Sequence, residues 1–110
     1  MKPTLREEVK RMARVPWIVF TDDVDGRRAE VGGSGLAAWE IVSIFRALGE
    51  DWDELRARFN WLKEEQLQAA LEYYRLYPDE IDVRVREEEA FRIEDVWERY
   101  PYTTPDFVKL

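Results

Sequence analysis

Helical periodicity dominates the middle of the chain, from Leu36 to Tyr77. Over residues 38–48 apolar side chains recur at i, i+3, i+4, i+7 and i+10, and two further apolar positions widen this face. Because only a narrow polar stripe remains, the pattern predicts a buried helix at the centre of the domain. Gly49 is the predicted end of this helix, and Ser34 is its candidate N-cap.

Two more helices follow in quick succession. Asp51, with Glu54 three residues later, predicts the start of a short helix over residues 52–59. A longer helix is predicted from about Leu62 to Leu76, because its apolar positions again follow a helical period. Three helices joined by tight turns are typical of helix-turn-helix domains. The predicted inner face of the third helix is Leu67, Ala70, Leu71 and Tyr74.

The segment before this core is predicted to hold a helix and a hairpin. Residues 4–13 are predicted to form a short amphipathic helix with Leu5, Val9 and Met12 on one side. Residues 15–31 contain two runs of strand-forming residues around an Asp- and Gly-rich turn, which indicates a β-hairpin.

Behind the core, two further helices and an extended tail are predicted. Pro78 suits the first turn of a fourth helix, which has only Ile81 and Val85 as an apolar stripe. A fifth short helix is predicted around Ile93, Val96 and Trp97, before a tail punctuated by proline. The fold class is therefore mainly α in a single domain, residues 1–110. Its parts are a basic N-terminal helix or arm (1–14), a β-hairpin (15–31), a helix-turn-helix core (32–83), and an acidic helix, short helix and tail (84–110).

The composition excludes several classes of chemistry. The chain has no Cys and no His, which removes disulfides, thiolate chemistry and the usual zinc and haem ligands. The aspartates before Gly26 do not match a calcium-binding loop, and the glycines of residues 32–35 do not match a phosphate-binding loop. We predict a non-enzymatic protein without a cofactor or a metal. No signal peptide or apolar run of about 18 residues occurs, so we expect a cytoplasmic location and no membrane association.

Residues 33–82 carry a series of core and turn residues in a defined order. They are Gly33-Ser34-Gly35-Leu36, Trp39-Glu40-Ile41-Val42, Leu48-Gly49, Phe59-Asn60-Trp61-Leu62, Glu65-Gln66-Leu67, Ala69-Ala70-Leu71-Glu72-Tyr73-Tyr74 and Pro78-Asp79-Glu80-Ile81-Asp82. This order resembles a bacterial and archaeal family called domain of unknown function 433 (DUF433), described as antitoxin-like. The resemblance implies a helix-turn-helix fold, a homodimer and an association with type II toxin–antitoxin systems.

The chain departs from the family pattern at two positions. Lys63 stands where members usually carry a helix-capping Thr, a loss that ordinarily costs about 1 kcal/mol. Gly35 replaces the Arg that members usually carry between the hairpin and the first helix.

Charge separates the functional hypotheses. The net charge is −7, and only residues 1–20 are basic, with five cations and two acids. DNA-binding proteins normally show a basic stripe, because neutralising phosphates dominates their affinity. Glu64 and Glu65, at the start of the predicted third helix, would repel phosphates, and we favour a role for them in complementing the helix dipole. The candidate DNA contacts are Lys10, Arg11, Arg14, Arg27, Arg28, Lys63, Gln66 and Gln68.

An acidic module is better suited to a basic protein partner, such as the substrate groove of an RNA-cleaving toxin. We therefore predict an antitoxin-like module that binds a protein, with a DNA-binding autoregulator and a structural homo-oligomer as alternatives. Trp39 and Trp97 fall on helical apolar faces, whereas Trp17 and Trp61 lie in or beside turns and strands. The candidate partner contacts are Trp17, Trp61, Tyr102 and Phe107, of which the last two could pack on their own domain or on a second subunit.

Overall fold

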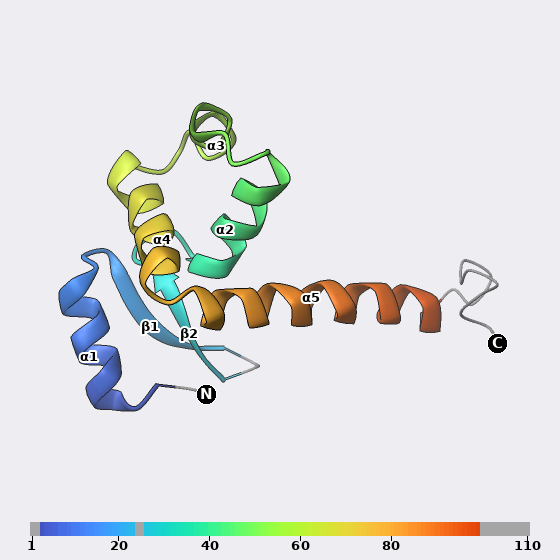
Figure 1. Ribbon diagram of the computed structural model, residues 1–110, viewed down its shortest axis with the longest axis horizontal. Coiled ribbons are helices and arrows are strands. Elements are labelled where there is room, and N and C mark those ends of the chain that lie inside the picture. The colour runs from blue at the N-terminus through green and yellow to red at the C-terminus, as the bar shows by residue number, and fades with distance from the viewer. Residues whose placement is uncertain (1–2, 24–25, 100–110) are drawn as a thin grey trace.

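A computed structural model describes residues 3–23 and 26–99 of the chain, with Asp23 and residues 90–99 described by their backbone alone. Figure 1 shows α2–α4 on one side of α5, and α1 with the sheet on the other. The predicted fold class, mainly helical with a short N-terminal hairpin, is confirmed. In chain order the elements are α1 (Leu5–Arg14), β1 (Ile18–Asp23), β2 (Gly26–Val31), β3 (Leu36–Ala37), α2 (Ala38–Ala47), α3 (Trp52–Arg58), α4 (Glu64–Leu76) and α5 (Pro78–Arg99).

Helix α1 lies where the sequence predicts it but turns a different side inward. The Oγ1 of Thr4 accepts a hydrogen bond from the backbone N–H of Glu7 and caps the helix. The apolar Leu5 and Val9 are 73% and 56% exposed, whereas Glu8 is buried. The helix is therefore held by polar contacts of its inner side, while Leu5 and Val9 of the predicted apolar stripe are exposed and Met12 is half-buried.

The hairpin is confirmed, and a third strand extends it. β1 pairs antiparallel with β2, with Ile18 opposite Val31, and β2 pairs with β3. The prediction that helix begins at Leu36 is wrong, because Leu36 and Ala37 complete the sheet. Ser34 is also not the N-cap of α2: its Oγ donates to the carbonyl of Val31 at 2.6 Å and stabilises the β2–β3 turn instead.

Helices α2, α3 and α4 occur in the predicted order, and α2 ends and α3 begins at the residues that the sequence indicates. Gly49, with φ +72°, closes α2, and the Asp51 carboxylate caps α3 by accepting the backbone N–H of Glu54 at 3.1 Å. Helix α4 starts at Glu64, two residues later than predicted, with Lys63 as its N-cap. The side chain of Lys63 makes no capping hydrogen bond.

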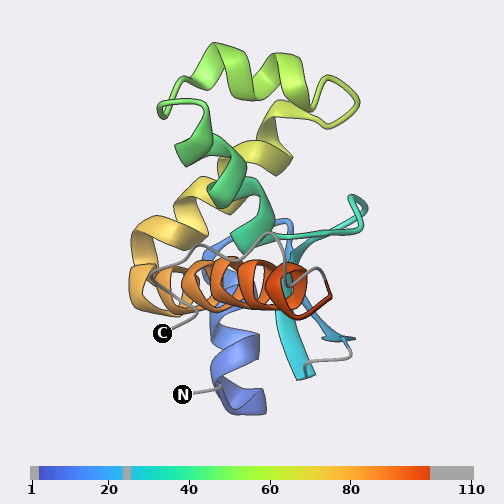
Figure 2. The same cartoon turned by 90° about the vertical axis from the view of Figure 1, so that its right-hand side faces the viewer.

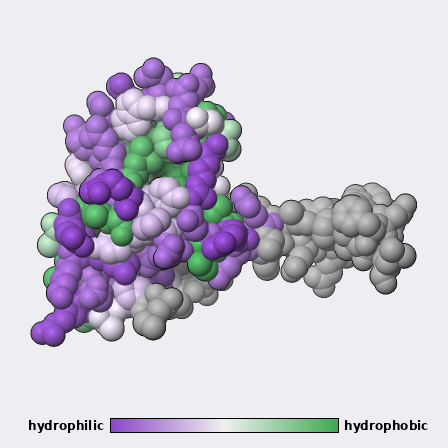
Figure 3. Space-filling model, in the orientation of Figure 1, coloured by the Kyte–Doolittle hydropathy of each residue, from purple (hydrophilic) through white to green (hydrophobic). Residues whose placement is uncertain are grey.

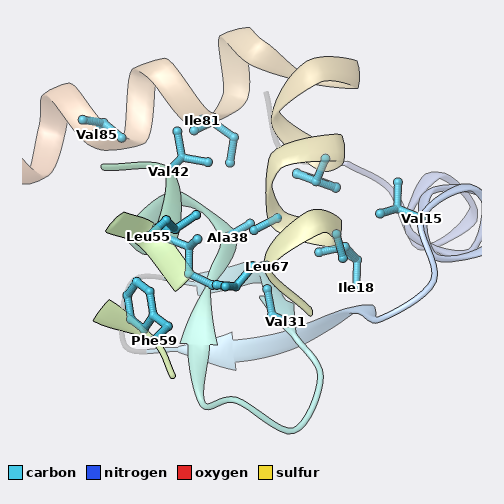
Figure 4. Packing of buried hydrophobic residues seen from close by; sticks show 14 residues of the cluster. Val15, Ile18, Val31, Ala38, Val42, Leu55, Phe59, Leu67, Ile81 and Val85 are labelled. Carbon is cyan, nitrogen blue, oxygen red and sulfur yellow. The ribbon is translucent and has the colours of Figure 1, made fainter. Parts of the chain in front are cut away.

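The core lies where α2 and α4 meet the sheet and the first turns of α5 (Figure 4). On α4 the predicted inner face needs two corrections: Tyr73 is fully buried, whereas Leu71 and Tyr74 are half-buried. The buried residues that define the core are Val15, Ile18, Val31, Ala38, Ile41, Val42, Leu55, Phe59, Leu67, Ala69, Ala70, Tyr73, Ile81 and Val85.

The two helices predicted after the core are one continuous helix. α5 runs from Pro78 to Arg99, because no proline or glycine interrupts this stretch. Among its described side chains, up to Glu89, those of Ile81 and Val85 belong to the buried core. Figure 1 shows that the rest of α5 extends beyond the body of the domain, and in Figure 2 this end of the helix faces the viewer. The side chains predicted for a fifth helix (Ile93, Val96, Trp97) and the tail residues Tyr100, Tyr102 and Phe107 lie outside the described part.

Candidate protein-binding surface

Trp17 occupies the corner between α1 and β1 in an unusual backbone conformation. Its φ is +81°, in the left-handed region that a bulky side chain rarely adopts. The corner is anchored on both sides, because Val15 and Ile18 are buried and the backbone N–H of Gly32 donates to the carbonyl of Trp17 at 2.6 Å. Trp17 as a whole is 41% exposed. The fold thus maintains a strained conformation that holds an aromatic ring at the surface.

An open groove of about 710 Å³ begins at Trp17 and runs along α4. Trp52 of α3 contributes to its apolar lining, and the ammonium of Lys63 lies 5.3 Å from the centroid of the Trp17 ring. The residues that line this groove, called the Trp17 groove below, are Arg14, Val15, Pro16, Trp17, Trp52, Glu65, Gln68, Ala69, Leu71, Glu72 and Arg75.

The exposed side of α4 gives the groove an acidic wall. Glu64 and Glu65 are exposed in the first turn, where they complement the helix dipole. The amide of Gln68 donates to the Glu64 carboxylate at 3.4 Å. Arg75 donates to Glu72, and this hydrogen bond lowers the pKa of the Glu72 carboxyl. Arg14 and Arg75 line the groove as well and match Glu65 and Glu72 in number, so the negative charge is confined to the first turn of α4, at Glu64 and Glu65.

Arg11, one of the predicted DNA contacts, is engaged inside the fold. Its guanidinium donates to the Tyr73 hydroxyl at 2.9 Å and to the Glu80 carboxylate at 3.0 Å, and it lies 4.0 Å from the ring centroid of Tyr77. The side chain is 15% exposed. Burial lowers the pKa of Arg11, but the bonds to Tyr73 and Glu80 outweigh it and raise the pKa overall. Arg11 therefore serves as a structural link, and we correct its assignment as a DNA contact.

The two arginines of β2 are also paired with acids. Arg27 donates to the buried carboxylate of Glu8 at 2.7 Å, and this hydrogen bond raises the pKa of Arg27. Arg28 lies 3.5 Å from the Glu40 carboxylate and donates to the carbonyl of Gly35. Their charges are thus balanced within the domain, which weakens their assignment as phosphate contacts.

Gln66 has a structural role that the sequence did not reveal. Its Oε1 accepts the backbone N–H of Lys63 at 2.8 Å, and its Nε2 donates to the carbonyl of Gly32 at 2.9 Å. The residue is 7% exposed. Gln66 therefore caps α4 and joins it to the β2–β3 turn, so it is corrected from a predicted base contact to a packing residue.

The remaining predicted residues lie at the surface. Lys10, Arg14, Lys63 and Gln68 are exposed. Trp61 is 61% exposed beside Phe59 but does not line the Trp17 groove. The structure therefore singles out Trp17 by its position in the groove and by its backbone strain, neither of which the sequence indicates.

The described part of the chain contains neither a metal site nor a membrane-spanning helix. Among the side chains of residues 3–22 and 26–89, no group of three or more acids is placed to hold a metal ion. Among the helices of residues 3–23 and 26–99, none combines the length and apolar character needed to cross a membrane.

Comparison with known proteins gives the family of the chain. Neither the curated proteins nor the solved structures provided a match. One family model, described as a protein of unknown function (DUF433), matches residues 18–74, which is more than half of the chain and includes the sheet, α2, α3 and most of α4. The chain therefore belongs to the DUF433 family.

Proposed function

We propose that this protein is a non-enzymatic, antitoxin-like helix-turn-helix module that binds a basic protein partner through the Trp17 groove and self-associates. The observation that carries the proposal is the strained, exposed Trp17 beside the acidic face of α4. Tryptophan is enriched among the residues that dominate binding energy in protein interfaces. An acidic wall adds electrostatic attraction for a basic surface and accelerates its association.

The antitoxin-like part of the proposal follows from the family resemblance and the charge. A type II toxin that cleaves RNA has a basic substrate groove, which is a suitable surface for an acidic module. The helix-turn-helix part follows from the order α2, α3 and α4, in which α4 has the place of the recognition helix. In this chain the exposed start of that helix carries Glu64 and Glu65, whose negative charge favours a protein partner over the phosphates of DNA.

Calorimetric titration against the product of the adjoining gene tests the proposal. We expect Trp17→Ala to weaken binding about 30-fold or more, as for an interface hot spot of about 2 kcal/mol. Trp61→Ala removes an equally large exposed ring outside the groove and is the matched control. Glu65→Lys should also weaken binding, whereas Glu89→Lys on α5 should not. Equal losses for the two tryptophan variants would contradict the role of the groove.

DNA binding is the second candidate, and one observation favours it. Lys10, Arg14 and Lys63 remain exposed, so a residual basic surface exists around α1. Titration with DNA from the promoter of its own gene, at increasing salt, decides between the two functions. A specific complex whose affinity falls steeply with salt would overturn our preference. Absence of a complex at low salt would exclude the repressor function for the protein alone.

A further inference from the structure

An arginine, an aromatic ring and a carboxylate meet at three places in the described part of the chain. The guanidinium carbons lie 4.0, 4.7 and 5.3 Å from the ring centroids, and each of these arginines also pairs with an acid. The three sets are Arg11 with Tyr77 and Glu80, Arg46 with Tyr74 and Asp82, and Arg84 with Trp39 and Glu88. The arrangement recurs because a planar guanidinium can stack on a ring and donate to a carboxylate at the same time.

The exposed ring of Trp17 has only half of this arrangement. Its cation is the ammonium of Lys63, 5.3 Å from the ring centroid. Among the described residues, this ammonium has no carboxylate partner. An ammonium is not planar and cannot stack, and a cation–π contact at an exposed site is weak. The contact between Lys63 and Trp17 is therefore one that a stronger ligand of the ring can displace.

The missing carboxylate is present in the same groove. Glu65 lies two residues after Lys63, is exposed, and lines the Trp17 groove together with the Trp17 ring. In the part of the chain that the structure describes, its side chain has neither an ion pair nor a hydrogen bond. Glu65 is therefore available to a cation that another protein supplies.

A chain of hydrogen bonds fixes Trp17 relative to the start of α4. The backbone N–H of Gly32 donates to the carbonyl of Trp17 at 2.6 Å, and the amide of Gln66 donates to the carbonyl of Gly32 at 2.9 Å. A Cβ atom at position 32 would lie 3.1 Å from the Trp17 carbonyl oxygen, so glycine permits this close approach. Since Gln66 directly follows Glu65, the ring and the carboxylate belong to one bonded unit. A ligand that binds both therefore orders little of the protein, which favours affinity.

The charges of the groove determine where a positive ligand binds. Arg75 pairs with Glu72 further along α4, and Arg14 of α1 is exposed. The negative charge is confined to the first turn of α4, at Glu64 and Glu65. A cation is therefore attracted to this turn, next to the Trp17 ring, rather than to the rest of the groove.

We propose that the Trp17 groove binds an arginine side chain of the protein partner, whose guanidinium stacks on Trp17, bonds to Glu65 and displaces the ammonium of Lys63. Lys63 is then a competitor within the chain that weakens binding. The proposal rests on the proposed function, because it names the side chain that the groove takes from a basic partner. Figure 3 shows a largely hydrophilic surface with apolar residues in small patches, which suits recognition through a charged anchor.

Titration with N-acetyl-L-arginine amide, followed by NMR, tests this site without the protein partner. The indole N–H signal of Trp17 is identified by its absence from the spectrum of Trp17→Phe. We expect this signal to shift saturably, with a dissociation constant on the order of a few millimolar. N-acetyl-L-citrulline amide has the same shape without the charge and should bind about tenfold more weakly, since charge-assisted hydrogen bonds are the stronger ones. Equal dissociation constants for the two compounds would overturn the proposal.

Lys63 provides the sharper test, because its removal should strengthen binding. Its side chain makes no capping hydrogen bond, so Lys63→Met leaves α4 capped as before. We expect the dissociation constant for the arginine compound to fall about threefold in this variant, the size of one exposed cation–π contact. Lys10→Met removes an exposed cation of α1 outside the groove and should leave the constant unchanged. Unchanged or weaker binding to Lys63→Met would contradict the displacement.

The carboxylate has its own matched pair of variants. Glu65→Gln should raise the dissociation constant for the arginine compound about threefold or more, because it removes a charge-assisted hydrogen bond. Glu54→Gln, on α3 and outside the groove, should not raise it. Equal effects of the two substitutions would overturn the role of Glu65.

The arginine site and the proposed function can fail separately. If Trp17→Ala weakens binding of the protein partner but the arginine compound does not bind, the groove remains the interface and the arginine anchor is wrong. If the compound binds as expected but Trp17→Ala leaves partner binding intact, the guanidinium site remains and the proposed function is wrong.

Discussion

The guanidinium of Arg11 in α1 lies 3.0 and 3.1 Å from the two carboxylate oxygens of Glu80 in the first turn of α5. The hydroxyl of Tyr73 on α4 completes the cluster, because it accepts from Arg11 and donates to Glu80. Helix α1 thus meets α4 and α5, at residues 62 and 69 positions further along the chain, through one arginine. The contact fixes α1 against the domain and explains why this helix is not a free basic arm.

Removing Arg11 should therefore destabilise the protein. Arg11→Ala removes the charged donor to Tyr73 and Glu80 and leaves Glu80 with the Tyr73 hydroxyl alone. We expect a loss of about 2 kcal/mol, typical of hydrogen bonds to charged groups. Arg6→Ala, on the exposed side of the same helix, should stay within about 0.5 kcal/mol. Urea unfolding followed by circular dichroism measures both. A loss that is equal in the two variants would contradict the structural role of the cluster.

The same cluster predicts sensitivity to alkali. Burial, and then the hydrogen bond to Glu80, raise the pKa of Tyr73 well above its ordinary value of 10.0. The stability contributed by the neutral hydroxyl is complete below about pH 10 and is lost as pH rises further, because the unfolded chain ionises first. The free energy of unfolding should fall above that pH, and less steeply in Tyr73→Phe. Tyr74→Phe is the control. If the free energy of unfolding fell equally steeply with pH in both variants, the prediction would be wrong.

Backbone strain at Trp17 predicts an inverted order of two substitutions. At an ordinary φ, alanine is more stable than glycine by roughly 0.5–1 kcal/mol. Because φ is +81° at this position, we expect Trp17→Gly to be more stable than Trp17→Ala by about 1 kcal/mol. The same pair at Val19 in β1 should keep the ordinary order. Thermal or urea unfolding of the four variants measures the order of stability at both positions. A Trp17→Ala protein more stable than the Trp17→Gly protein would contradict the strain.

Gln66 should matter more than its neighbour Gln68. Gln66→Ala removes both the cap of α4 and the bond to Gly32, and two such hydrogen bonds amount to about 2 kcal/mol. Gln68 is exposed and bonds only to Glu64, so Gln68→Ala should change the unfolding free energy by less than about 0.5 kcal/mol. Gln66→Glu keeps the acceptor for Lys63 but places a buried carboxylate oxygen against the Gly32 carbonyl, so we expect it to lose more stability than the one donor bond contributes.

Local signals in the sequence were sufficient for most element boundaries. Gly49 and Asp51 mark the break between α2 and α3 because a left-handed glycine and a capping carboxylate act within one turn of the chain. Pro78 marks the start of α5 for the same reason, since its effect depends only on its own φ and its missing N–H.

Local signals failed where a distant residue decides the outcome. Ser34 is a good N-cap residue by type, but pairing of β3 with β2 moved the start of α2 to Ala38. The exposure of Leu5 and Val9 could not be predicted from periodicity, because the inner side of α1 is set by the partners of Glu8 and Arg11.

The sequence by itself determined the class of fold, the order of the helices, the hairpin and the acidic balance of charge, since these depend on periodicity, end signals and composition. Only the tertiary structure decided which charges remain available to a partner. Arg11, Arg27 and Gln66 look like surface residues in a linear sequence, yet each is bonded to a group between 19 and 69 positions away. The position of Trp17 at the mouth of a groove has the same origin, because the groove forms only when α3 and α4 pack beside the corner between α1 and β1.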